Sequence, residues 1–184
     1  MNNIKTSPPK SESSLTIKIY PKIYKLINMF RKMRRYKQEL PEDECINILE
    51  NEKRGVLAVL GDDDYPYTVA MNHVLFNGKL YFHCAKEGHK IDAIDKTDKV
   101  SYCVMDDGVK LDDNWWYTFR NVVVFGRISK VSDDNLIDKI LYMMGEKFNA
   151  TAEYMAAEMK SARDRVQILE LNIEHMSGKI VNEK

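Results

Sequence analysis

The sequence predicts a mainly β domain, an antiparallel barrel of Greek-key type with helical attachments. Segments with strand character follow one another between residues 55 and 131, and Asn77-Gly78 is a strong hairpin signal between two of them. Helical periodicity appears in separate insertions and does not alternate with the strands, which disfavours a parallel βαβ architecture. With 184 residues and 44% hydrophobic composition, the chain is long enough for one compact domain with its own core.

Composition excludes several classes of protein. The 28 basic and 28 acidic side chains balance, so no global field favours nucleic acid as a partner. The three cysteines are widely separated and odd in number, which suits a reducing cytoplasm better than a disulfide framework. No apolar run approaches the roughly 18 residues that a membrane-spanning helix needs. We therefore expect a cytoplasmic protein without a membrane span.

The N-terminal region differs from the rest of the chain. Residues 1–15 lack the apolar run of a signal peptide and are expected to be disordered. Residues 16–38 contain eight Lys or Arg side chains and no acidic one, and apolar side chains recur at helical spacing beyond Pro21. A basic amphipathic helix here would be an appended element, or a tether to a membrane or nucleic acid. We divide the chain into an N-terminal extension, 1–32, and a folded domain, 33–184.

The first half of the folded domain carries two helices and four strands. Pro41 and the acidic residues after it favour the start of a helix, in which Ile46 and Leu49 are expected to face inward. Residues 61–66, rich in Asp and Gly, are expected to form a turn. The elements expected here are a helix at 40–53, a buried strand at 55–60, strands at 67–76, 79–85 and 99–105, and a short helix at 89–96.

The second half carries a long strand, two helices and a closing strand. The strand at 115–131 contains Gly126, which indicates a bulge or bend. Ser132 is expected to cap the helix at 133–148, whose apolar side chains step by four residues along one face. A second helix at 151–163 and a strand at 166–175 complete the prediction.

Common catalytic and nucleotide-binding motifs are absent from the sequence. It contains no GxGxxG or GxxxxGK[ST] loop, so a phosphate would have to be held in another way. The four histidines show no metal-ligand spacing, and the run Asp62 to Asp64 lacks the alternation of a calcium loop and indicates a solvated turn. No GxSxG elbow or Cys–His pairing favours a hydrolase. We expect no metal and no catalytic constellation of side chains.

The segment YFHCAKEGHK, residues 81–90, leaves two interpretations open. In the first, a hydrophobic strand ends and a polar turn starts a short helix, a common arrangement without any ligand. In the second, Gly88 and His89 open the helix so that its free N–H groups and dipole point at an anion. Lys90 would then add a full positive charge to the same place. Spacing alone does not decide between a plain turn and a phosphate site.

Five ordered segments resemble the split-barrel flavoproteins related to pyridoxamine 5'-phosphate oxidase, in the branch that includes the 5-nitroimidazole-resistance proteins. They are MRRYKQELPEDECINIL, GVLAVLGDDDYPYTVAMNHV, GKLYFHCAKEGHKIDAI, FRNVVVFGRI and LELNIEHMSGK, and they run from Met33 to Lys179. The resemblance implies a six-stranded split β-barrel that forms a homodimer and holds FMN in a cleft at the subunit interface. The first 30 or so residues lie outside the resemblance.

The same resemblance implies which residues hold the cofactor. One strand would run beside the isoalloxazine ring, the HCAKEGHK motif and the start of a later strand would lie near the phosphate, and the C-terminal HMSGK motif would reach the flavin region. The implied flavin-binding residues are Thr68, Val69, Ala70, Met71, Asn72, His83, Ala85, Gly88, His89, Lys90, Arg120, Asn121, His175, Gly178 and Lys179.

Three positions depart from the family pattern. Ala70 stands where Pro is common, and Asn121 stands where Ser is common, so its reach to a phosphate differs. His73 fills a position near the ring that is Tyr-like in the family. A neutral imidazole there would either supply a proton to a flavin or simply pack and hydrogen bond.

The leading functional expectation is an FMN-dependent oxidoreductase. It would pass hydride or electrons to a small acceptor such as a nitroaromatic or a quinone, with NADH or NADPH as a candidate donor. A flavin- or haem-binding protein without turnover is an alternative of a different class. Pyridoxamine 5'-phosphate oxidase-like activity is a further alternative within the same family.

Several apolar side chains have two interpretations. Trp115 and Trp116 are expected to be buried surface, or to flank the flavin or the dimer interface. The methionines between residues 143 and 159 are expected in a helix core, or as a flexible substrate wall. Cys84 and Cys103, inside strands, are expected to be small buried hydrophobes.

Overall fold

The computed structural model describes residues 30–182. The chain divides into two units between Tyr36 and Lys37, and the sheet and helices belong to the second unit. The disordered tail expected at 1–15 and nearly all of the basic helix expected beyond Pro21 lie outside the described residues. The division of the chain at residue 32 stays a prediction.

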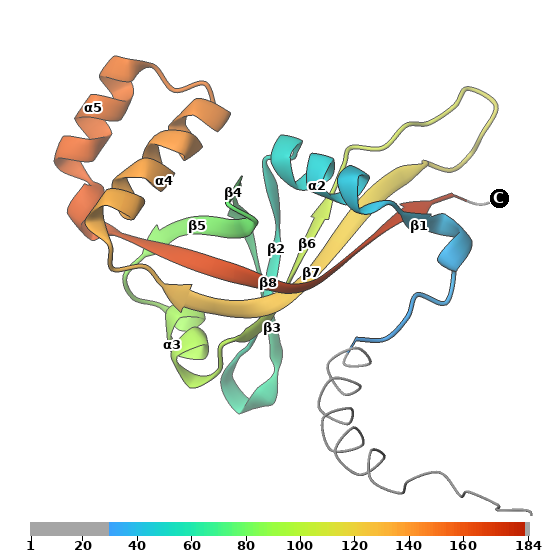
Figure 1. Ribbon diagram of the computed structural model, residues 1–184, viewed down its shortest axis with the longest axis horizontal. Helices are drawn as coiled ribbons and strands as arrows, with labels where there is room; N and C mark the ends of the chain where they lie inside the picture. Colours follow the sequence, from blue (N-terminus) through green and yellow to red (C-terminus); the bar gives the residue numbers. More distant parts are fainter. Residues whose placement is uncertain (1–29, 183–184) are drawn as a thin grey trace, which may run out of the picture. The chain divides into compact units, whose positions relative to one another are not determined.

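One antiparallel eight-stranded sheet forms the second unit. Its strand order is β3-β2-β6-β7-β8-β5-β4, and β1 pairs with β8 beside this path. The strands are β1 (Glu39–Leu40), β2 (Arg54–Leu60), β3 (Pro66–Asn72), β4 (Val74–Phe76), β5 (Lys79–Ala85), β6 (Lys99–Met105), β7 (Phe119–Lys130) and β8 (Val166–Val181). All pairings are antiparallel, and the long strands β7 and β8 curve through the middle of a half-barrel (Figure 1). The mainly β fold class is therefore confirmed.

Between residues 30 and 182, four α-helices are attached to this sheet, each where the sequence predicts one. They are α2 (Glu42–Asn51), α3 (His89–Lys96), α4 (Asp134–Lys147) and α5 (Ala152–Ser161). The helices α4 and α5 form a pair next to β5 and the beginning of β8 (Figure 1). The helix α3 follows β5 directly and packs against β2.

The core consists of two apolar clusters. The larger one lies on the inner face of the half-barrel and includes the fully buried Leu57, Phe82 and Tyr102. The smaller one lies under α4 and includes Ile140 and Ile168. Two local signals are also confirmed: Asn77 and Gly78 both have positive φ in the hairpin between β4 and β5, and the register between β7 and β8 shifts at Gly126.

The single strand predicted at 67–76 is wrong, because the chain forms two strands that part at His73. The first, β3, ends one side of the strand order, and the second, β4, ends the other. His73 is fully buried at the crossing, with its Nε2 2.8 Å from the carbonyl oxygen of Leu49 and its Nδ1 2.9 Å from the hydroxyl of Tyr102. These two contacts lie far away in the sequence, so local strand propensity could not show the break.

Two predicted side-chain positions also need correction, those of Ile46 and Ser132. Ile46 is 37% exposed, and Cys45 and Ile48 are buried with Leu49, because the buried face of α2 follows an i, i+3, i+4 spacing. Ser132 does not cap α4. The side chain of Asp133 does so by accepting hydrogen bonds from the two backbone amides that follow at N2 and N3.

Surface strands and loops are more exposed than the sequence predicted. The strand β2 is buried on alternate residues and Leu60 at its end is 42% exposed. Trp115 is 79% exposed and lies in the loop before β7, outside the strand expected to contain it. Cys84 and Cys103 are partly buried free thiols, and burial raises the pKa of both.

Candidate flavin site and the adjoining pocket

The beginning of α3 is an open helix N-terminus. Gly88 precedes the helix with φ of 117° and ψ of 167°, a conformation that strongly favours glycine. The first helical hydrogen bond runs from the amide of Ile91 to the carbonyl of Gly88 over 2.7 Å. The amides of His89 and Lys90 therefore precede this first bond. A Cβ built on Gly88 would meet no atom within 4 Å, so a ligand can approach these amides.

The side chains of His89 and Lys90 differ in their contacts with other residues. His89 stacks on Tyr67 with 4.2 Å between ring centroids, and its Nε2 lies 3.5 Å from a carboxylate oxygen of Asp62. Lys90 is half-buried and forms no ion pair or side-chain hydrogen bond with any described residue. Burial raises the pKa of the nearby Cys84 thiol, and the positive charge of Lys90 acts in the opposite direction and lowers it. Lys90 is thus the cation at this helix start that remains available to an anion.

The strand β3, which the resemblance places beside a flavin ring, is an edge of the sheet. It pairs with β2 on one side and ends the strand order on the other. Thr68 and Ala70 are exposed, Val69 and Asn72 are half-buried, and Met71 is buried in the core. The free edge leaves backbone N–H and C=O groups that can hydrogen bond to a planar polar ligand.

A second group of candidate residues lies at the opposite end of β6. In the strand register Asn121 is opposite Lys179, and the neighbouring pair includes Gly178. Nε of Arg120 donates to Asp106 over 2.8 Å, and this hydrogen bond raises the pKa of the guanidinium. Within one chain, the structure does not bring this group next to Lys90, because α3 precedes β6 and Asn121 pairs with its last residue.

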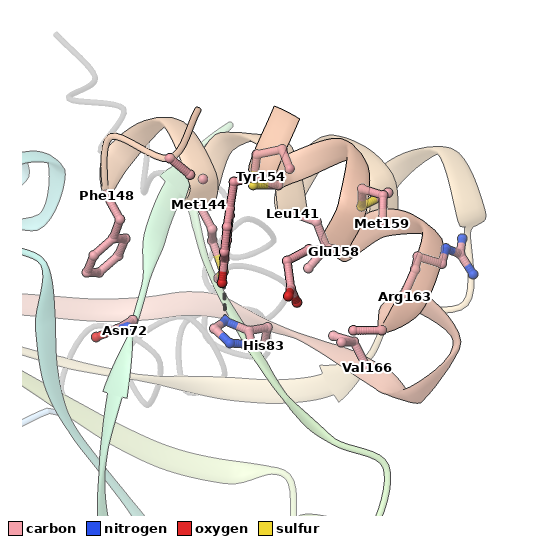
Figure 2. Close-up of a pocket in the computed structure, with 14 residues that line it drawn as sticks. Asn72, His83, Leu141, Met144, Phe148, Tyr154, Glu158, Met159, Arg163 and Val166 are labelled. Atoms are coloured by element: carbon pink, nitrogen blue, oxygen red, sulfur yellow. Dashed lines mark hydrogen bonds between the residues drawn. The ribbon is translucent and has the colours of Figure 1, made fainter. Parts of the chain in front are cut away.

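Three candidate residues on β5 and β8 remain, and they lie apart from one another. His175 is opposite Phe125 in the register, with ring centroids 6.2 Å apart and planes at 28°. Ala85 is exposed at the end of β5 near α3. His83, on the same strand, instead points into a pocket beneath α4 and α5, as Figure 2 shows.

This helix-pair pocket has a volume of about 250 Å³ and mostly apolar walls. Asn72 and His83 line it from the strands, and side chains of α4 and α5 line it from above (Figure 2). Nδ1 of His83 lies 3.1 Å from the sulfur of Met144, and desolvation lowers the pKa of this imidazole. The sequence-based alternative of a methionine wall agrees with Met144, Met155 and Met159 in this lining, whereas the expectation of a helix core does not hold for α5, which has no buried residue. Tyr154 and Glu158 were missed, although their spacing beside the methionines was an available signal.

His73, the expected neighbour of the ring, is a core residue. It is fully buried and engaged at both ring nitrogens, and burial lowers its pKa to about 4. Its imidazole therefore packs and hydrogen bonds, and it has no exposed face for a ligand. Between residues 30 and 182, no group of three or more His, Cys, Asp or Glu is placed to hold a metal, and no helix is long and apolar enough to cross a bilayer.

An antiparallel half-barrel with attached helices is the architecture of the split-barrel class of proteins. The model of the pyridoxamine 5'-phosphate oxidase family matches residues 41–180, and the chain belongs to this family. No curated protein matches the sequence.

Solved structures share this fold at low sequence identity. A Bacteroides thetaiotaomicron protein named for 5-nitroimidazole antibiotic resistance superposes with a TM-score of 0.64 and 17% identity, covering 77% of this chain and 86% of that one. An FAD-binding protein from Mesorhizobium loti gives 0.58 and 21%, covering 79% and 97%. An FAD- and haem-binding protein from Mycobacterium smegmatis gives 0.59 and 17%, covering 80% and 74%.

Proposed function

We propose that the chain is a flavin-dependent oxidoreductase that binds FMN and passes electrons to a small acceptor such as a nitroaromatic or a quinone, with NADH or NADPH as donor. The observation that carries this proposal is the open start of α3, where Lys90 has no acidic partner among the described residues. Family membership supports a flavin as the ligand, and so do the names of the FAD-binding neighbours. The unpaired thiols suit a cytoplasmic location.

The described residues fit the two ends of an FMN molecule. The side chain of Lys90 and the amides of His89 and Lys90 would hold the phosphate through charge-assisted hydrogen bonds and the helix dipole. The free edge of β3, from Thr68 to Asn72, would hydrogen bond to the polar edge of the ring. Bound FMN would supply the electron-transfer chemistry, which agrees with the expectation that no catalytic side chain is required.

A homodimer with FMN at the subunit interface is part of the proposal. The candidate residues near Lys90 and those near Arg120 lie at opposite ends of β6 in one chain. A partner protomer could supply the second group to the flavin held by the first, because a two-fold axis presents the same residues twice. Arg120 would then need to exchange its contact with Asp106 for the phosphate, or contribute only a longer-range field.

The test of cofactor binding is a titration of the purified protein with FMN, followed by the absorption near ~450 nm and by flavin fluorescence. Loss of one charge-assisted contact in Lys90→Ala should weaken FMN binding about tenfold or more. Lys160→Ala, which removes an exposed lysine on α5, is the matched control and should bind like the parent protein. Failure of the parent protein to bind FMN would contradict the proposal.

Turnover is tested separately, by anaerobic reduction of the bound flavin with NADH or NADPH and reoxidation with a nitro compound or quinone. A protein that holds flavin but fails both half-reactions would be a carrier or sensor. The haem-binding neighbour favours one specific rival. A band near ~400 nm after addition of haem, with no FMN binding, would support that rival. Pyridoxamine 5'-phosphate serves as a further substrate in the same assay.

A further inference from the structure

The helix-pair pocket has the walls of a site for a small aromatic molecule. Three methionines, Met144, Met155 and Met159, line it together with Phe148. Thioether sulfurs make favourable contacts with aromatic rings and adapt their shape to a ligand. At about 250 Å³ the pocket exceeds the roughly 150 Å³ cavity that is known to accept benzene in an engineered protein core.

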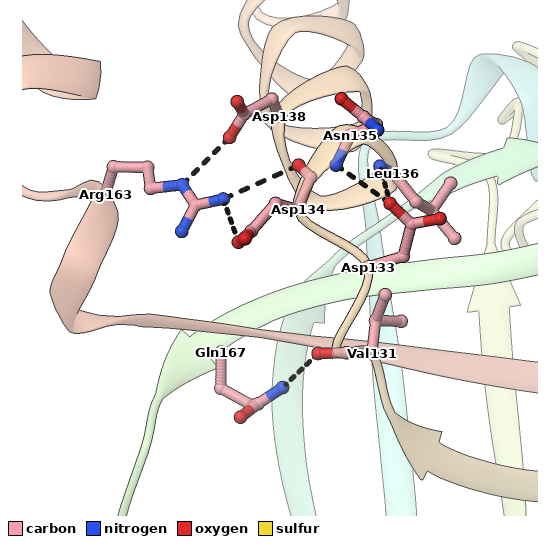
Figure 3. Close-up of polar contacts among 8 residues, drawn as sticks. All are labelled: Val131, Asp133, Asp134, Asn135, Leu136, Asp138, Arg163 and Gln167. Atoms are coloured by element: carbon pink, nitrogen blue, oxygen red, sulfur yellow. Dashed lines mark hydrogen bonds and ion pairs between the residues drawn. The ribbon is translucent and has the colours of Figure 1, made fainter.

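The helices above the pocket are fixed by polar contacts, although α5 contributes no buried residue to the core. Arg163, just after α5, donates to Asp138 over 2.9 Å and to Asp134 over 2.6 Å, which ties it to the first turns of α4 (Figure 3). Thr151 caps α5 through the amide of Tyr154. These contacts fix α5 relative to α4, so the pocket beneath α5 is a defined part of the fold.

The charges in the pocket select among aromatic ligands. Arg163 is the one cation among the described residues that line it, and two carboxylates already neutralise its guanidinium. The carboxylate of Glu158 has no ion-pair or hydrogen-bond partner among the described side chains, and it is directed from α5 toward the strands (Figure 2). Burial lowers the pKa of the imidazole of His83, which disfavours a positive charge on this side of the pocket. The pocket thus offers an unpaired negative charge beside an apolar space.

We propose that the helix-pair pocket binds a small planar aromatic molecule that carries a cationic or N–H-donating nitrogen group. The ring lies among the methionines and Phe148, and the nitrogen group donates to the carboxylate of Glu158. An aromatic carboxylate or phosphate is disfavoured, because its charge would face Glu158 without a free cation nearby.

The position of the pocket connects it to the flavin site. Asn72 and His83, both candidate flavin residues, form its floor. The assignment of the aromatic molecule as the electron acceptor rests on the proposed function, whereas the binding site itself does not. A nitrogen heteroaromatic acceptor would have its ring beside the end of β3.

The experiment compares three probes of one shape and different charge on the full chain without FMN, by isothermal titration calorimetry. The probes are benzamidine, benzamide and benzoate. Benzamidine should bind about tenfold more tightly than benzamide, and benzoate should bind most weakly. Glu158→Gln should bring benzamidine within about threefold of benzamide. Glu146→Gln, an exposed acid on α4 outside the pocket, should keep the original ranking.

A filling substitution separates this pocket from other surfaces. Ala162→Leu places extra volume in the wall and should weaken benzamidine and benzamide alike, with circular dichroism as the check on folding. Absence of binding, equal affinity for the three probes, or a ranking unchanged in Glu158→Gln would overturn the proposal. If the probes behave as expected and FMN does not bind, the flavin proposal falls and the pocket stands. If FMN binds and the probes do not, the pocket proposal alone falls.

Discussion

At the scale of single residues, His73 shows how burial sets protonation. Its Nε2 donates to the carbonyl of Leu49, and its Nδ1 faces the hydroxyl of Tyr102, which has the carbonyl of Met71 as a second acceptor at 2.8 Å. A protonated imidazole would satisfy every one of these groups, but desolvation opposes the charge and lowers the pKa to about 4. The neutral ring then leaves Tyr102 with one proton for two acceptors.

This lowered pKa predicts a loss of stability at acid pH. A histidine whose folded pKa lies below its unfolded value favours folding when neutral, so the stability is present above about pH 6.5 and is lost as pH falls toward 4. Between pH 7 and 5 the expected loss is about 2 kcal/mol of unfolding free energy. Urea unfolding at both pH values measures it.

The control for this loss is His73→Asn, which removes the titrating group and should reduce the change between pH 7 and 5 by most of that amount. His83, whose pKa is also lowered by burial, contributes in the same direction and accounts for a residual slope. An equal slope in parent and His73→Asn would show that His73 titrates normally in the folded state.

At the scale of elements, helix ends decide how the α4–α5 pair is held. The buried face of α4 covers the smaller apolar cluster, whereas α5 is fixed mainly through Thr151, Arg163 and contact with α4. Gly145 permits that contact, since a Cβ at this position would collide with the sulfur of Met155. Helix caps and one close approach thus maintain the pocket between the pair.

The cap of α4 gives a direct test at this scale. Asp133→Ala should lower the unfolding free energy by about 1 kcal/mol, because two backbone amides lose the carboxylate that accepts from them. Ser132→Ala is the matched control, and its effect should stay within about 0.5 kcal/mol. Chemical unfolding of both variants at neutral pH measures the difference. A larger loss in Ser132→Ala than in Asp133→Ala would mean that the cap lies one residue earlier.

At the scale of the whole molecule, the candidate flavin residues are divided between two ends of the sheet. Lys90 lies near the free edge at β3, and Arg120 lies at the far end of β6 and β7. A site that uses both from one protomer would require the sheet to be rebuilt. Two protomers related by a two-fold axis would need no such change.

The proposed dimer predicts complementation between two defective variants. Lys90→Ala and Arg120→Ala should each bind FMN weakly, and their mixture after subunit exchange should recover roughly a quarter of the tight sites. Half of the dimers would be mixed, and each mixed dimer would have one intact site. Sedimentation should give twice the 21.5 kDa chain mass. A monomer that binds FMN tightly, or a mixture without recovery, would contradict a shared interface.

The elements that the sequence predicted well depend on local physics. The hairpin at Asn77-Gly78 requires positive φ at both residues, a conformation that Asn and Gly adopt more readily than other residues. The periodicity of α4 likewise involves neighbours within a few residues. Such local signals can be recognised in the sequence alone. The five ordered motifs add the family, and with it the fold.

The sequence by itself determined the class of fold, the order of the elements and the start of a short helix after Gly88. The tertiary structure decided the break at His73, the inward turn of Ile48 in place of Ile46, and the pocket beneath α5. The break at His73 and the pocket depend on groups more than 20 residues apart, such as the carbonyl of Leu49 and the ring of His73. Burial and hydrogen bonding between distant segments override local preference, because their free energies exceed the differences in propensity at single positions.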